Sequence, residues 1–98
     1  MIKVMPHDAG LETFGMYTAN VSYVNKADGY FRYRITSPIA ATPEGIVTEE
    51  GFASLVNVSD NALRCSLSVG DTVRLLLFLK RGKDGAKRNH VAEVLAEV

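Results

Sequence analysis

The fold is decided by the stretch LSVGDTVRLLLFLK at residues 67–80, where a short turn leads into a nearly continuous apolar run. The run Val73–Leu79 is typical of a strand that is buried on one side and covered on the other. Asp84-Gly85 predicts a hairpin turn after this strand. Residues 90–98 fit either a closing strand or a helix with one apolar stripe. Their β-branched content and their position after a hairpin favour the strand.

A second hairpin is predicted by the stretch VSYVNKADGYFRYRI at residues 21–35, in which Asp28-Gly29 is a strong turn signal. Aromatic and basic residues alternate after the turn, and successive side chains of a strand point to opposite faces. The side of Tyr23 stays open, because strict alternation buries it with Val21 whereas a β-bulge would expose it. We expect the core to take Phe31, Tyr33 and Ile35, together with Leu75 and Phe78 of the apolar run, and we expect Tyr30, Arg32 and Arg34 to face solvent or a ligand.

The rest of the chain supplies the remaining strands and their connections. Residues 14–24 are rich in β-branched and aromatic side chains and predict the first strand. A proline-containing loop at 37–45 precedes a short strand at 46–48, a turn at 49–51 and a third main strand at 52–58. Ser59-Asp60 can cap one helical turn at most. Five strands with short turns predict an all-β chain that forms a small antiparallel barrel, because closure hides the strand edges.

The composition restricts what the chain can do. It has 98 residues, equal numbers of acidic and basic residues, and one cysteine, Cys65. One cysteine excludes an internal disulfide, and since the only other soft ligands are two histidines, we expect no metal site and no cofactor. A reduced thiol favours the cytoplasm, and the longest apolar run is too short to span a bilayer, so we expect no membrane partner. We interpret residues 1–12 as an N-terminal arm or an edge strand, and residues 13–98 as a single domain.

Charge is unevenly distributed, although the formal net charge is zero. The segment 80–90 carries five basic residues against one acid, a local balance of +4, and residues 44–60 carry four acids and no lysine or arginine, a local balance of −4. A basic hairpin of this kind attracts phosphate, whereas the acidic segment would attract a basic partner. The sequence contains no phosphate-binding glycine loop and no set of nucleophile and base at catalytic spacing, so we do not expect an enzyme.

The order of these pieces resembles the cold-shock domain over residues 15–96. VSYVN at 21–25 looks like the first strand of that family, GYFRY at 29–33 stands where its first ribonucleoprotein motif lies, and LVNVS at 55–59 stands at the second. LSVGDTV at 67–73 is similar to the segment that leads into its fourth strand. The resemblance implies an OB-like barrel of cold-shock type that binds single-stranded RNA or DNA by stacking bases on aromatic side chains. It assigns nucleic-acid contacts to Tyr23, Tyr30, Arg32 and Asn57. The second motif lacks the aromatic side chains of the family, and Phe52 could substitute for them if its strand is displaced.

We therefore predict a single-stranded nucleic-acid-binding protein of low sequence specificity. Bases would stack on Tyr30, and on Tyr23 if a bulge exposes it. The phosphate backbone would be held by the basic residues of both hairpins, which are Arg32, Arg34, Lys80, Arg81, Lys83, Lys87 and Arg88. The alternative is a protein-interaction or regulatory module on the same barrel, whose acidic loop at 44–50 contacts a basic partner. We interpret His90 as an ordinary strand residue, and the sequence predicts no oligomeric state.

Overall fold

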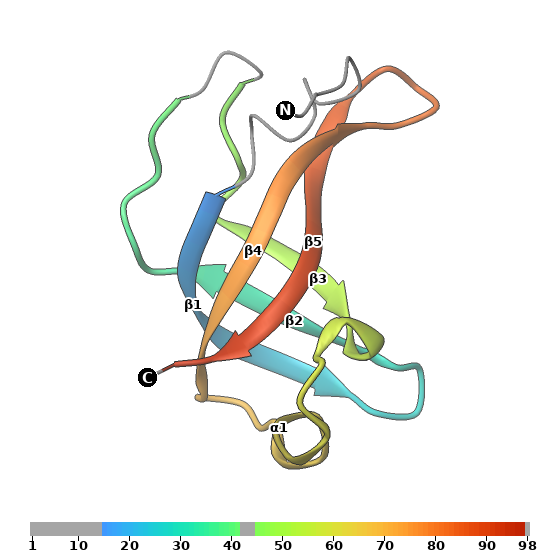
Figure 1. Ribbon diagram of the computed structural model, residues 1–98. Coiled ribbons are helices and arrows are strands. Elements are labelled where there is room, and N and C mark those ends of the chain that lie inside the picture. Colours follow the sequence, from blue (N-terminus) through green and yellow to red (C-terminus); the bar gives the residue numbers. More distant parts are fainter. Residues whose placement is uncertain (1–14, 42–44, 98) are drawn as a thin grey trace, which may run out of the picture.

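The computed structural model describes residues 15–41 and 45–97, so the N-terminal segment 1–12 lies outside the described residues. The strands are β1 (Gly15–Asn25), β2 (Tyr30–Ile35), β3 (Glu50–Ser54), β4 (Thr72–Arg81) and β5 (Lys87–Ala96). All neighbours pair antiparallel in the order β3-β2-β1-β4-β5, and the sheet curls into a nearly closed barrel (Figure 1). The predicted fold, a small five-stranded antiparallel OB-like barrel, is confirmed.

The C-terminal hairpin is formed by β4 and β5. Val73, Leu75 and Leu77 point into the barrel and are buried, and β5 is a strand rather than the alternative helix. The expectation that Phe78 belongs to the core is wrong. Phe78 follows Leu77 in a regular strand and therefore points to the outer side, where its ring lies 5.0 Å, centroid to centroid, from the ring of His90.

The N-terminal hairpin is formed by β1 and β2, and its alternation is as predicted. Phe31, Tyr33 and Ile35 are all buried, whereas the residues between them face outward. The register between β1 and β2 shifts between Val21 and Tyr23, which marks a β-bulge. Because of this extra residue, Tyr23 is 44% exposed although it stands two positions after the buried Val21.

The third strand begins and ends earlier than predicted. β3 runs over Glu50–Ser54 instead of 52–58, so Glu50 and Gly51 belong to the strand rather than to a turn, and residues 46–48 form no strand. Ser54 ends β3 because its hydroxyl accepts the N–H of Val56 at 3.2 Å and caps a single 3₁₀ turn, Leu55–Asn57. The sequence of this turn is apolar enough to be mistaken for a strand.

The one α-helix of the described residues connects the two halves of the barrel. Asp60 caps α1 (Asn61–Ser66) by accepting the N–H groups of Ala62 and Leu63, as the sequence predicts. The helix has six residues and therefore exceeds the single turn that we expected. Neither this helix nor the 3₁₀ turn, the two helical segments that the structure describes, is long and apolar enough to cross a membrane.

The barrel is held together along a seam between its two edge strands, β3 and β5. No main-chain hydrogen bond joins these two strands in the described part of the chain. At one end of the seam the side-chain amide of Asn89 accepts the N–H of Thr48 (3.0 Å) and donates to the Thr48 carbonyl (2.9 Å) and the Tyr33 hydroxyl (3.0 Å). At the other end Asn57 Nδ2 donates to the carbonyl of Val91 (3.0 Å). The seam is therefore fastened at both ends and open between them.

Gly51 is required where β3 meets the ring of Tyr33. The two residues pair across β2 and β3, and a Cβ at position 51 would lie 2.5 Å from Tyr33 Oη and 2.8 Å from Cζ. The ring is 1% exposed and its hydroxyl is held by Asn89, so it cannot easily move aside. We expect Gly51→Ala to lower the free energy of unfolding by roughly 1–2 kcal/mol in a urea titration. Glu50→Ala, whose side chain points outward, is the control, and an equal loss in both variants would contradict this account.

Candidate nucleic-acid interface

Three aromatic rings gather on the outer face of β1, β2 and β3, one from each strand. The ring of Tyr30 on β2 lies 6.0 Å from that of Tyr23 on β1 and 6.1 Å from that of Phe52 on β3, measured between centroids. Phe52 is 68% exposed, Tyr23 is exposed and Tyr30 is half-buried between them. These residues are called the ring cluster below. They form a continuous aromatic surface that faces solvent.

The position of Tyr30 in this cluster is set by the β1–β2 turn. Asn25 closes the turn by accepting the N–H of Asp28 and donating to the Asp28 carboxylate, both at 3.0 Å. Gly29 has φ +77°, a conformation that favours glycine, and it directs the chain into β2. A groove of about 410 Å³ runs from this turn along Tyr30 to Phe52. The turn thus delivers the central ring to the edge of a groove.

Arg32 lies within the same face. It pairs in register with Tyr23 on one side and with Phe52 on the other, and it forms no ion pair with any described residue. An exposed guanidinium between two rings can bind a phosphate or stack on a base. The structure therefore brings Tyr23, Tyr30 and Arg32 together as the resemblance implied. It adds Phe52, which the sequence marks only as an aromatic side chain near the expected second motif.

Arg34 is on the same strand but is already paired. Its Nε lies 2.7 Å from Glu49 Oε2, and the hydrogen bond and charge of Glu49 raise the pKa of the guanidinium. Glu50, which is in register with Arg34 across β2 and β3, contributes to the same rise. Arg34 therefore adds little net positive charge to the face, because two carboxylates accompany it.

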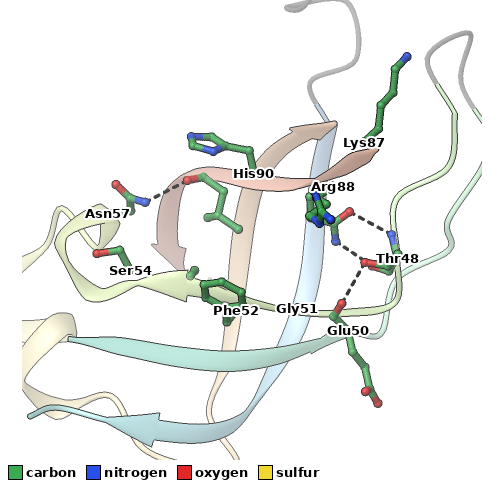
Figure 2. Close-up of a pocket in the computed structure, with 12 residues that line it drawn as sticks. Thr48, Glu50, Gly51, Phe52, Ser54, Asn57, Lys87, Arg88 and His90 are labelled. Atoms are coloured by element: carbon green, nitrogen blue, oxygen red, sulfur yellow. Dashed lines mark hydrogen bonds between the residues drawn. The ribbon is translucent and has the colours of Figure 1, made fainter. Parts of the chain in front are cut away.

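The basic residues of the hairpin formed by β4 and β5 fall into two groups, only one of which lines a groove. Its tip extends from the end of the barrel opposite the β1–β2 turn (Figure 1), and Lys80, Arg81 and Lys83 line none of the three grooves described for this surface. Lys87 and Arg88, at the start of β5, do line a groove together with Phe52 (Figure 2). Since Lys80 and Arg81 stand opposite Arg88 and Lys87 in the register of β4 and β5, the structure brings only the β5 side of the hairpin to the groove beside the ring cluster.

Part of the charge of the hairpin is neutralised within it. Arg88 Nη2 lies 2.7 Å from Asp84 Oδ2, and hydrogen bonding by Arg88 lowers the pKa of the Asp84 carboxyl to about 2. Arg81 Nη1 donates to the carbonyl of Gly85 at 2.8 Å. These contacts shape the turn, and they leave less charge for a ligand than the local balance of +4 indicates.

Asn57 lies in the groove between β3 and β5, which has a volume of about 440 Å³ (Figure 2). The figure shows Phe52 on one side of the groove and His90 on the other, with Ser54 and Asn57 toward one end. One amide hydrogen of Asn57 is used by the carbonyl of Val91. The residue is half-buried and helps to fasten the seam, besides any contact with a ligand.

His90 is an exposed residue on the rim of this groove. Partial burial against its neighbours and, to a lesser extent, the charge of Lys80 lower the pKa of its imidazole below the usual 6.5. Because the unfolded chain takes up this proton first, stability falls as the pH drops through 6.5 toward the lowered folded value. We expect Lys80→Ala to raise the pKa of His90 only part of the way to 6.5, since burial remains. An NMR titration of the imidazole protons measures this, and Lys83→Ala, which should leave the pKa unchanged, is the control.

Within residues 15–41 and 45–97, no group of three or more His, Cys, Asp or Glu side chains is placed to hold a metal ion. Comparison of the chain with known protein families, curated proteins and solved structures finds no match. The functional assignment therefore depends on the ring cluster, the grooves beside it and the charges around them.

Proposed function

We propose that this protein binds single-stranded RNA or DNA through the outer face of β1, β2 and β3. The observation that carries the proposal is the ring cluster, Tyr23, Tyr30 and Phe52, with Arg32 in register between two of its rings. Exposed apolar groups gathered on one surface mark an interaction site. Unpaired bases offer flat faces that stack on such rings, each stacked base contributing about 1–3 kcal/mol.

The same geometry supports low sequence specificity on the ring cluster. Every base has a π-face, so stacking tolerates any sequence, and Arg32 contacts the backbone that all sequences share. The resemblance to the cold-shock domain supports this assignment independently of the geometry. The proposed role is binding without catalysis, and the free thiol of Cys65 is consistent with a reducing compartment such as the cytoplasm.

The proposal is tested by fluorescence anisotropy with labelled octanucleotides of DNA and RNA at about 50 mM salt, where phosphate contacts are strongest. We expect saturable binding to single strands and much weaker binding to a duplex of the same sequence, because a duplex hides the base faces. Absence of binding to every single strand under these conditions would contradict the proposal.

The salt dependence of this binding should be shallow. Arg32, Lys87 and Arg88 border the ring cluster and its grooves, and Asp84 already neutralises part of the charge of Arg88. No more than about three phosphates are therefore neutralised, and the slope of log K against log salt should be no steeper than about −2. Engagement of all seven predicted cations would give a slope of about −5. Arg32→Ala should reduce the magnitude of the slope by about 0.7, whereas Lys83→Ala at the hairpin tip should not change it. A slope steeper than about −4 would place the hairpin tip in the interface and overturn this geometry.

A second candidate function is protein interaction, favoured by the exposed carboxylates of Glu49 and Glu50 at one end of the same face. A basic partner could bind there, although Glu49 would have to exchange Arg34 for the new cation. Pull-down from a lysate with and without nuclease treatment separates the two candidates. Partners that survive nuclease, that are lost in Glu49→Gln/Glu50→Gln and that accompany a lack of oligonucleotide binding would favour the interaction module.

A further inference from the structure

We infer that the groove between β3 and β5 is a nucleobase-recognition subsite, which receives one unstacked base of the bound strand and reads its hydrogen-bonding edge. The inference rests on the proposed function and extends it, because the ring cluster alone does not discriminate between bases. The groove has a volume of about 440 Å³, and rings stand on both of its rims (Figure 2). Phe52 comes from β3, and His90 comes from β5 with its ring supported by Phe78 at 5.0 Å.

The groove is continuous with the ring cluster through Phe52. This ring contacts Tyr30 at 6.1 Å and also lines the groove between the edge strands. A strand whose bases stack on Tyr30 and Phe52 therefore reaches the rim of the groove without leaving the protein surface. The next base along the strand can turn into the groove, in the way that protein-bound single strands splay their bases.

Polar groups suited to a base edge face the groove from the main chain of β3. The Glu49 carbonyl and the Leu55 N–H both bond to the β2 side, to Ile35 and Gly29 respectively. Main-chain groups alternate in direction along a strand, so the N–H and the carbonyl of Phe52 point away from β2, toward β5. No main-chain group of β5 in the described residues meets them. These groups can therefore bond to a ligand in place of water.

The groove has an apolar floor and polar groups along its sides. Ala53 and Val91 line it and are each 4% exposed, which gives an apolar floor. The amide of Asn57 adds polar atoms at one end. The exposed imidazole of His90 stands on the rim, on the side of β5 away from Phe52 in Figure 2, and a change of side-chain rotamer turns its nitrogens over the rim toward a bound base. A neutral imidazole has one donor and one acceptor, and so does the exposed main chain of Phe52. The edge of a base presents donors and acceptors in a pattern that differs between bases, so the groove will favour some bases over others.

The test compares dissociation constants for three labelled DNA octamers, oligo(dA), oligo(dC) and oligo(dT), since a homopolymer presents the same base in every register. In the wild-type protein we expect the tightest and weakest octamers to differ about tenfold, as a well-placed pair of hydrogen bonds allows. His90→Phe keeps a ring against Phe78 and removes both nitrogens. It should reduce the difference to about twofold, mainly by weakening the preferred octamer. Arg32→Ala is the control, and it should weaken all three octamers by one common factor.

The outcomes separate the subsite from the proposed function. If all three octamers bind the wild-type protein and His90→Phe leaves their ratios unchanged, the subsite is refuted and the ring cluster stands. The same result is expected if the groove receives an extended peptide instead of a base. If the wild-type protein binds the three octamers equally, the subsite is again refuted. If no octamer binds, the proposed function fails and the subsite fails with it.

Discussion

Replacement of Asn89 by alanine is expected to lower the free energy of unfolding by about 2–3 kcal/mol, because this one side chain closes the end of the seam at Thr48. Asn89 donates to the Tyr33 hydroxyl and exchanges two hydrogen bonds with the main chain of Thr48. Tyr33 is 1% exposed, so the loss of its partner leaves a buried polar group unsatisfied. Thermal or urea denaturation measures the effect.

Two controls make this prediction specific. Asn20→Ala removes one exposed hydrogen bond, that from Thr72, and should change stability by no more than about 0.5 kcal/mol. Tyr33→Phe removes the hydroxyl that Asn89 satisfies, so Asn89→Ala should cost less in that background than in the wild type. Equal losses from Asn89→Ala in both backgrounds would show that the hydroxyl contact contributes nothing.

The pKa of Tyr33 gives a second readout of the same contact. Burial raises the pKa of this phenol above 10.0, and the hydrogen bond from Asn89 opposes the rise. Asn89→Ala should therefore move the pKa of Tyr33 further up, which an ultraviolet titration of the tyrosines detects. Because phenolate is disfavoured in the folded state, stability decreases above about pH 10, and the variant should show this decrease more strongly.

Alternation along β2 could be predicted from the sequence because it follows from strand geometry alone. Phe31, Tyr33 and Ile35 are buried and the side chains between them face outward, as the pattern requires. The same rule, with no knowledge of neighbouring strands, left Tyr23 undecided, since a bulge depends on how β1 meets β2. The same alternation places Phe78, which follows the buried Leu77, on the outer face, and so the burial that we expected for Phe78 is wrong.

The bounds of the third strand and the positive charge available to a ligand could not be predicted from the sequence. The strand is ended by a local cap, and the available charge depends on ion pairs between residues distant in sequence. Three of the four residues 55–58 are apolar and typical of a strand, yet the Ser54 hydroxyl stabilises a 3₁₀ turn there. The aromatic side chain that β3 contributes to the ring cluster is Phe52, which stands five positions before Asn57, the residue to which the resemblance assigned the contact. Likewise the pairing of Arg34 with Glu49 follows from the register of β2 and β3, so a count of charges along the chain overstates what is available.

Tyr30→Ala is expected to weaken the binding of single-stranded octanucleotides by about 1–3 kcal/mol, or roughly 5- to 150-fold in Kd, because it removes the central ring of the cluster. Tyr30 contacts both Tyr23 and Phe52, so its loss also leaves two rings without their neighbour. Stability should change little, since the ring lies on the outer face rather than in the core. Fluorescence anisotropy gives the Kd, and circular dichroism confirms that the variant folds.

Matched variants decide whether stacking is the cause. Tyr30→Phe keeps the ring and should keep most of the affinity, whereas Val56→Ala alters an apolar side chain that is 79% exposed outside the cluster and should have no effect. Phe52→Ala should resemble Tyr30→Ala, and because the two rings touch at 6.1 Å, the double variant should lose less than the sum of the two. If Tyr30→Ala binds as tightly as the wild type while octanucleotides still bind, the strand lies on another surface, and the ring cluster is not the interface.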